Sequence, residues 1–134
     1  MGKKNYEVII PPDVKPKPDD YEKITAKLMS EFLKSDISFV RRESSTTPDI
    51  LVVRLNQIWE IKNIRGNNEN TINRNLKGIW KQSENVIITL FRSKMTPSQA
   101  KGRIKEKLSR ANRLKRVVLI TKSKKLIKIK DDVV

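Results

Sequence analysis

The chain has 134 residues, and its 30 lysines and arginines outnumber 15 aspartates and glutamates, giving a formal charge of +15 and a pI near 10.2. Such an excess of positive charge favours polyanionic partners, of which nucleic acid is the usual one. The sequence has no histidine and no cysteine, which excludes catalysis by paired histidines, a His-Asp-Ser arrangement, thiol nucleophiles, zinc fingers and disulfides.

No window approaches the roughly eighteen consecutive apolar residues of a membrane span. The N-terminus lacks the apolar core of a signal peptide. With 37% hydrophobic residues, a chain of this length can bury one core. We therefore predict an extended, proline-rich lead-in over residues 1–18 and a single domain over residues 19–134.

The first half is expected to contain one helix and several strands. Asp19 and Asp20 are favourable at a helix start. Apolar side chains then recur at helical spacing, at Tyr21, Ile24, Leu28 and Phe32. The strands expected around this helix lie at residues 5–10, 37–40, 49–54 and 58–63, with a polar loop at 43–47.

In the second half, residues 63–70 are rich in glycine and asparagine and are expected to form a loop. A helix follows at about 71–83, and Thr96-Pro97 begins another, with the threonine as cap. The strands expected in this half lie at residues 86–90, 116–121 and 126–129. Together the pattern predicts an α/β fold with a central mixed sheet flanked by helices.

Two carboxylates and a lysine on neighbouring strands are the most informative feature. Glu60 and Lys62 point to the same side because strand side chains alternate. A tight turn at residues 55–57 would bring Asp49 beside Glu60. Carboxylate oxygens suit a hard cation such as Mg²⁺, and a lysine can steady a scissile phosphate or an attacking water. The alternative is an ordinary surface of alternating charges, but Asp49 opens an apolar strand, where an unpaired charge is costly.

The positive charge is unevenly distributed. The first 91 residues contain 15 basic and 12 acidic residues, whereas residues 92–130 contain 15 basic residues and one acid, Glu106. This division suits an enzyme that holds nucleic acid with one region and cuts it with another; the alternative is a basic, solvated surface. The residues expected to attract phosphates are Lys101, Arg103, Lys105, Lys107 and Arg110.

Two further groups are open to two interpretations. On the helix at 71–83, Thr71, Asn75 and Gln82 lie close together beside the basic face that includes Lys81, so they suit either a substrate-facing wall or a solvated boundary. Glu22 is either a first-turn acid favoured by the helix dipole or a third carboxylate at the metal site.

The residues around the hairpin resemble a known family. The element order, with Pro48-Asp49 and Glu60-Ile61-Lys62, resembles the PD-(D/E)XK nuclease superfamily, whose core is restriction-endonuclease-like. More narrowly, several blocks resemble the C-terminal tRNase domain of contact-dependent growth inhibition toxins. These blocks are Thr47-Pro48-Asp49, Trp59-Glu60-Ile61-Lys62, Asn70-Thr71-Ile72, the run from Lys81 to Ile88, and Val118 to Lys122.

The resemblance implies roles for individual residues. Asp49, Glu60 and the carbonyl of Ile61 would bind Mg²⁺ or Mn²⁺, and Lys62 would be the catalytic lysine. Glu22 would take the place of the glutamate of the first helix, and Gln82 that of the polar residue on the following helix. The sequence departs from the family pattern at Tyr21, where relatives often have histidine, and at Thr89, where they have aspartate.

The expected function is therefore a metal-dependent endonuclease that cleaves RNA, with tRNA as substrate. It would act in the target-cell cytoplasm after delivery as part of a larger secreted protein, or as a free-standing relative. An acidic immunity protein is an expected partner, and a homodimer remains open. The alternatives are a DNA endonuclease of a mobile element on the same scaffold, and a non-catalytic, basic RNA-binding protein.

Overall fold

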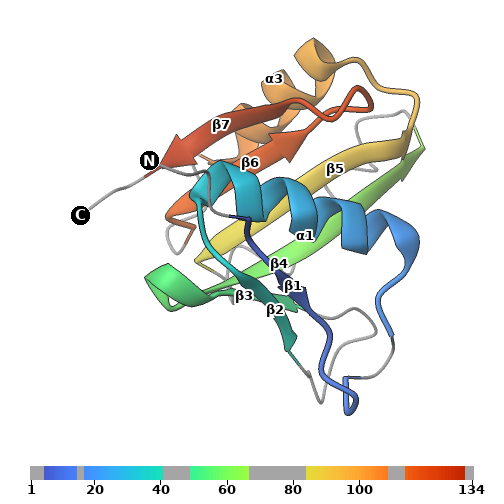
Figure 1. The fold of residues 1–134 in the computed structure, drawn as a ribbon. Coiled ribbons are helices and arrows are strands. Elements are labelled where there is room, and N and C mark those ends of the chain that lie inside the picture. Colours follow the sequence, from blue (N-terminus) through green and yellow to red (C-terminus); the bar gives the residue numbers. More distant parts are fainter. Residues whose placement is uncertain (1–4, 15–16, 41–48, 67–83, 109–113, 132–134) are drawn as a thin grey trace. The chain divides into compact units, whose positions relative to one another are not determined.

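A computed structural model describes residues 5–14, 17–40, 49–66, 84–108 and 114–131 (Figure 1). In these ranges the chain forms strands joined in parallel and antiparallel pairs, with two α-helices. The predicted α/β class with mixed strand directions is confirmed at this level. Two compact units divide the chain, residues 1–61 and 62–134. The prediction of a single domain over residues 19–134 stays a prediction.

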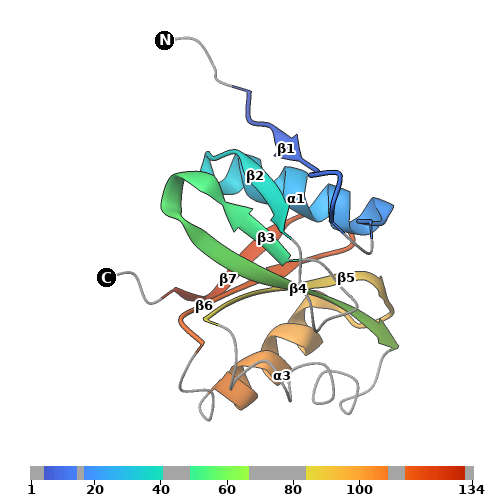
Figure 2. The same ribbon diagram turned by 90° about the horizontal axis from the view of Figure 1, so that it is seen from below.

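The part of the first unit that the structure describes contains four strands and one α-helix. They are β1 (Val8–Ile9), α1 (Asp20–Leu33), β2 (Ile37–Val40), β3 (Asp49–Val52) and the first part of β4 (Gln57–Gly66). β1 pairs with β2 in parallel, and the pairs β2–β3 and β3–β4 are antiparallel. α1 packs against β1, β2 and β3, and Figures 1 and 2 show it beside these strands.

The turn between β3 and β4 is tighter than a simple loop. After Val52 the chain forms a single 3₁₀ turn, η1 (Val53–Leu55), which ends at Asn56 with φ of 51°. Asparagine tolerates this left-handed conformation better than most residues. The predicted strand at 49–54 is therefore too long at its end, but the predicted hairpin is confirmed.

Among the described residues, the second unit contains the end of β4, three further strands and one helix. The further strands and the helix are β5 (Asn85–Ser93), α3 (Pro97–Leu108), β6 (Arg116–Ile120) and β7 (Leu126–Asp131). β5 pairs with β6 in parallel, as expected for strands joined through a helix, and β6 pairs with β7 in an antiparallel hairpin with a register shift between Val117 and Val118.

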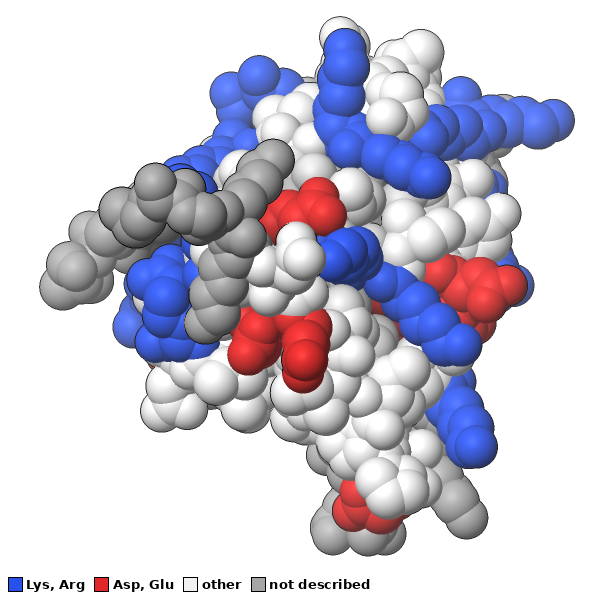
Figure 3. All heavy atoms as spheres, viewed as in Figure 1, with Lys and Arg blue, Asp and Glu red and all other residues white. Residues whose placement is uncertain are grey.

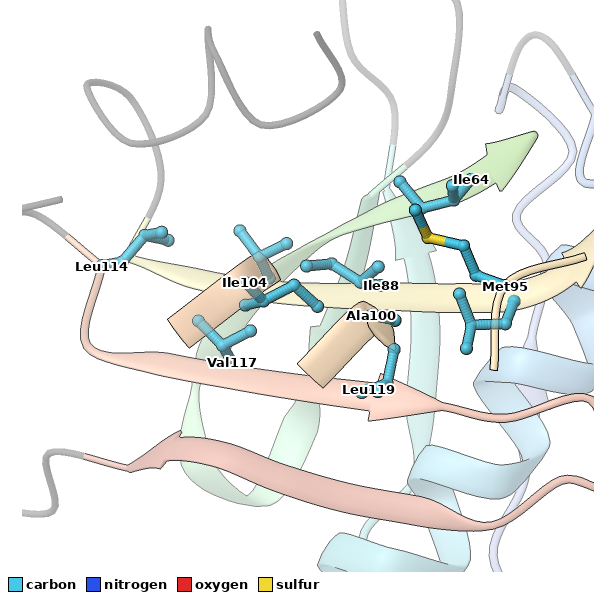
Figure 4. Close-up of a cluster of buried hydrophobic side chains, with 10 residues drawn as sticks. Ile64, Ile88, Met95, Ala100, Ile104, Leu114, Val117 and Leu119 are labelled. Atoms are coloured by element: carbon cyan, nitrogen blue, oxygen red, sulfur yellow. The ribbon is translucent and has the colours of Figure 1, made fainter. Parts of the chain in front are cut away.

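Aliphatic side chains from these elements form the core of the second unit. Ala100 and Ile104, four residues apart on α3, are fully buried against side chains of β5 and β6. Figure 4 shows them beside Ile88, Val117 and Leu119. The cluster also contains Ile64 of β4, so this part of β4 belongs to the packed interior.

Two expected boundaries are wrong. Residues 63–66 were expected in a loop, but β4 continues to Gly66 because Ile64 is completely buried in the core cluster. β5 is also longer than the predicted strand at 86–90, extending to Ser93. In the described ranges, neither helix is long and apolar enough to cross a membrane.

Candidate active site

The strand pairing brings Asp49 and Glu60 together. β3 and β4 are antiparallel with Ile50 opposite Trp59, so the next step of the register places Asp49 opposite Glu60. Side chains directly opposite each other in an antiparallel pair have Cβ atoms about 4.5–5.5 Å apart and lie on the same face. The predicted juxtaposition of the two carboxylates therefore follows from the observed register.

Both carboxylates are largely shielded from solvent. Asp49 and Glu60 each retain 7% of their accessible surface. Their strand neighbours Ile50 and Trp59, which alternate to the other face, are 0% and 2% exposed. Two acids held side by side at low exposure repel each other, and a cation between them would offset that repulsion.

Lys62 follows Glu60 by two residues in the same strand and is half-buried. The next residue, Asn63, alternates to the other side, where its Oδ1 accepts a hydrogen bond from the hydroxyl of Thr89 on β5. Thr89 is fully buried. Thr89, where relatives have aspartate, therefore has a structural role, because its hydrogen bond to Asn63 joins β5 to β4 immediately after Lys62.

Glu22 is part of a capping box at the start of α1. The amide of Asp19 donates to Glu22 Oε1 at 2.8 Å, and the amide of Glu22 donates to Asp19 Oδ1 at 2.8 Å. Such a reciprocal pair satisfies two backbone donors that the helix itself leaves unpaired. Glu22 is only 5% exposed, so its carboxylate has a defined structural function at the helix N-terminus.

Among the described residues, no three acidic side chains form a group that could hold a metal ion. The strand register brings Asp49 and Glu60 together. Glu22 does not join them in one cluster. A pair of carboxylates is still a common Mg²⁺ site, because Mg²⁺ usually keeps several waters and takes only one or two carboxylates.

Four of the five basic residues predicted to attract phosphates lie on α3 of the second unit. Lys105 is exposed, and Lys101, Arg103 and Lys107 are half-buried. Arg103 lies 3.9 Å from Glu106 in an ion pair between partly exposed side chains, which partly offsets its charge. On the face drawn in Figure 3, lysine and arginine side chains project singly or in small groups, with acidic side chains between them.

Several predicted site residues lie outside the described ranges. These are Thr71, Asn75, Lys81, Gln82 and Arg110. Their proposed contacts with nucleic acid remain predictions.

One residue that positions the hairpin was missed in the sequence. Arg54, in the turn before β4, donates from Nη2 to the carbonyl of Leu33 at 2.7 Å and from Nε to the carbonyl of Lys34 at 3.1 Å. It thereby satisfies carbonyls at the C-terminal end of α1, whose last turn has no basic residue of its own. When the last turn of a helix contains no basic residue, a basic residue from elsewhere in the chain can bind its carbonyls. In the sequence this is only a weak signal.

The comparisons with known proteins agree with this description. Residues 46–126, more than half of the chain, match the family described as contact-dependent growth inhibition CdiA C-terminal domain. The fold is similar to that of a solved CdiA-CT/CdiI toxin and immunity complex from Burkholderia pseudomallei, with a TM-score of 0.60 and 15% identity. That match covers 92% of this chain and 98% of the other. No curated protein sequence matches the chain.

Proposed function

Because the chain belongs to the contact-dependent growth inhibition CdiA C-terminal domain family, we propose that it is a toxic effector and that its activity is metal-dependent cleavage of RNA. The observation that carries this proposal is the register that sets Asp49 opposite Glu60, with Lys62 two residues further along β4. The same arrangement supports the finer assignment to the PD-(D/E)XK nucleases.

The donor set suits Mg²⁺ or Mn²⁺. Asp49 and Glu60 would provide carboxylate oxygens, and the main-chain carbonyl of Ile61 would provide a third oxygen ligand. All three are hard donors, and the chain has no histidine or cysteine that would favour a softer metal. When bound, the ion supplies Lewis-acid activation of a phosphate and a more acidic bound water.

The protein's own side chains would bind and orient the substrate. The ammonium of Lys62 would donate hydrogen bonds to the attacking water and to a phosphate oxygen, offsetting negative charge that develops on the phosphate. Glu22 would act through a water, because its Oε1 already accepts the Asp19 amide. Gln82, Asn75, Thr71 and Lys81 are proposed to position the nucleic-acid backbone.

We assign tRNA as substrate on the resemblance of the sequence blocks. A nucleophile supplied by a metal-bound water does not depend on the ribose 2′-hydroxyl, so the chemistry itself does not select RNA over DNA. The high positive charge favours either polymer. The chain has two tryptophans, two tyrosines and three phenylalanines, which leaves little material for a base-stacking platform of a purely binding protein.

Delivery and neutralisation are part of the proposal. As a domain of this family, the chain would act in the cytoplasm of a target cell after delivery as part of a larger secreted protein. The structural neighbour is a toxin and immunity complex, which supports the proposal that an immunity protein binds this chain.

The test is incubation of the purified chain with total tRNA and with duplex DNA, in Mg²⁺ or in EDTA. The unaltered chain should produce discrete tRNA fragments in Mg²⁺ and none in EDTA. Asp49→Asn and Lys62→Ala should lose cleavage while still binding tRNA. Glu22→Gln should lower the rate about 10- to 100-fold, the usual effect of residues that act on a metal through another group.

Lys23→Ala is the matched control, because Lys23 is an exposed lysine on α1 outside the candidate site, and it should cleave at the normal rate. Cleavage of DNA in place of tRNA would support the assignment of the catalytic residues and reject the assignment of tRNA as substrate. Binding of both polymers without cleavage in Mg²⁺ or Mn²⁺ would reject the nuclease and leave a basic nucleic-acid-binding protein.

A further inference from the structure

The turn between β6 and β7 concentrates positive charge in one short loop. Lys122, Lys124 and Lys125 are all exposed. Within the described ranges, none of these three side chains is in an ion pair or a hydrogen bond. The sequence also contains no aspartate or glutamate from residue 107 to residue 130. We call Lys122, Lys124 and Lys125 the turn lysines.

Hydrogen bonds hold the backbone of this turn in one conformation. The amide of Thr121 donates to the carbonyl of Lys125 at 2.9 Å, and the amide of Lys124 donates to the carbonyl of Thr121 at 2.9 Å. The amide of Lys125 donates to Thr121 Oγ1 at 3.1 Å, and this hydroxyl also lies 3.0 Å from Ser123 Oγ. Because the loop is already ordered, less conformational freedom is lost when the turn lysines bind a ligand.

Lys124 adopts a backbone conformation that is unfavourable for lysine. Its φ is 68°, in the left-handed region where a residue with a Cβ atom is strained. Hairpin loops of three residues usually have glycine at this position. A turn selected only for stability would therefore have glycine here. Retaining a lysine is understandable if its ammonium group has a ligand.

The turn lies at the edge of the second unit where α3 begins. β5 and β6 are parallel. α3 follows the carboxyl end of β5, and the turn follows the carboxyl end of β6, so both connections lie at the same edge of these strands. Lys94, in the connection from β5 to α3, is exposed as well. Two separate connections therefore bring positive charge to this edge.

The composition of the turn selects a phosphate backbone as its ligand. Residues 121–125 are one threonine, one serine and three lysines. A segment that binds a membrane surface also needs apolar side chains that enter the bilayer, and the centre of a protein interface is rich in aromatic and apolar groups. Recognition of RNA bases needs aromatic rings or arginine for stacking. Ammonium groups without such neighbours suit phosphates, which carry no sequence information.

We propose that the turn lysines bind phosphates of the nucleic-acid substrate, as a contact additional to the basic residues of α3. This inference rests on the proposed function for the identity of the polyanion. The turn and α3 belong to the same unit, and α3 packs against β7. One nucleic-acid strand can therefore contact both without any rearrangement of the two units.

The test compares glycine substitutions at two exposed lysines with positive φ. Lys124→Gly removes one of the turn lysines. Lys34→Gly is the matched control, because Lys34 has a φ of 52° at the end of α1 in the first unit and carries the same charge. Both substitutions should raise the urea midpoint of unfolding, because glycine adopts this conformation without strain.

Affinity should separate the two variants. Binding of tRNA to the full chain is measured in EDTA across a range of salt concentrations. Lys124→Gly should weaken binding about fivefold at roughly 0.1 M salt and lower the slope of log K against log salt concentration by about 0.7 to 0.9, the effect of one lost phosphate contact. Lys34→Gly should leave both the affinity and the slope unchanged.

Lys122→Gln and Lys125→Gln should each reproduce the loss of affinity without changing the residue with positive φ. In Mg²⁺, each of these variants should raise the KM for tRNA cleavage, because the contact holds the substrate and does not take part in the chemistry.

The outcomes distinguish this inference from the proposed function. Cleavage of tRNA with unchanged affinity in all three turn variants would reject the turn as a phosphate contact and leave the nuclease intact. Binding of tRNA through the turn lysines without cleavage would reject the nuclease and support the contact. Equal losses for Lys34→Gly and Lys124→Gly would overturn the inference, because net charge alone would then explain the affinity. Weaker binding to phosphatidylserine vesicles, with tRNA affinity unchanged, would assign the turn to a membrane surface instead.

Discussion

At the scale of residues, the two opposed carboxylates cost the sheet stability, and the proposed metal site would offset this cost. Asp49 and Glu60 face each other across β3 and β4 at 7% exposure each, and like charges in opposed positions destabilise a sheet. A sheet selected only for stability would have an apolar or oppositely charged pair here. Retaining two acids is understandable if a cation completes the site.

We therefore expect Glu60→Gln to raise the free energy of unfolding in EDTA by a few tenths to about 1 kcal/mol, because it removes one of two opposed charges. Mg²⁺ should raise the free energy of unfolding of the unaltered chain by an amount that grows with the ratio of Mg²⁺ concentration to its Kd. It should have no effect on the variant. Chemical denaturation with and without Mg²⁺ measures both effects. Glu31→Gln, at an exposed acid of α1, serves as control, and a destabilised Glu60→Gln would contradict the prediction.

At the scale of elements, α1 is held by different means at its two ends. Local sequence provides the N-terminal cap, where Asp19 and Glu22 are three residues apart. The C-terminal end relies on Arg54, about 20 residues further along the chain, whose guanidinium binds two carbonyls. The backbone amide of Arg54 also donates to Ser35 Oγ at 2.9 Å. The hairpin that carries the carboxylates is thus attached to α1.

Arg54→Ala should lower the free energy of unfolding by about 1 kcal/mol, a modest value because these hydrogen bonds are exposed. Arg54→Lys should recover less than half of the loss, since an ammonium lacks the planar fork that reaches both carbonyls. Urea denaturation of the full chain gives these values, with Lys23→Ala as control. Full recovery by lysine would show that charge at the helix end, and not the paired hydrogen bonds, stabilises α1.

At the scale of the whole molecule, the acidic pair and most of the basic excess lie in different parts of the chain, which suits the proposed division between cutting and binding of nucleic acid. The carboxylate pair lies in the first unit, and α3 with its lysines and arginines lies in the second. Residues 92–130 contain half of all basic residues and one acid. If the chain acts as proposed, affinity for nucleic acid should depend on the basic residues of α3 far more than on Asp49, Glu60 and Lys62.

Lys101→Ala and Lys105→Ala should weaken tRNA binding and flatten its salt dependence. The slope of log K against log salt concentration should fall by roughly 0.7 to 1 for each phosphate contact removed. Filter binding of catalytically inactive Asp49→Asn chains, across a range of salt concentrations, gives the slopes without cleavage. Lys23→Ala should leave the slope unchanged. Unchanged slopes for both α3 variants would place the phosphate contacts elsewhere.

Features set by local sequence were predictable, and features set by distant contacts were not. Alternation along β3 and β4 and the short turn between them were sufficient to predict that Asp49 meets Glu60. The continuation of β4 to Gly66 was missed because only the buried position of Ile64 in the core cluster overrides a loop-like composition. The hydrogen bonds from Arg54 to the carbonyls of Leu33 and Lys34 could not be predicted either, since they join residues about 20 positions apart in the sequence.

The second role of Glu22 shows a different limit. The first-turn position was recognised from the sequence, and the reciprocal bonds with Asp19 make it a capping residue. Residue type and position alone could not decide between capping and catalysis, because a carboxylate at the start of a helix suits both. Its proposed action at the metal site therefore depends on the cleavage assay with Glu22→Gln.

The boundary between the two compact units falls inside a continuous strand, between Ile61 and Lys62 of β4. An extended strand keeps residues two apart at roughly 7 Å, so the spacing between Glu60 and Lys62 is set by the backbone of β4 alone. Rearrangement of one unit against the other would leave that spacing intact. Under the proposed function, substitutions in the second unit away from Lys62 could change which nucleic acid is bound, while the spacing between Glu60 and Lys62 stays the same.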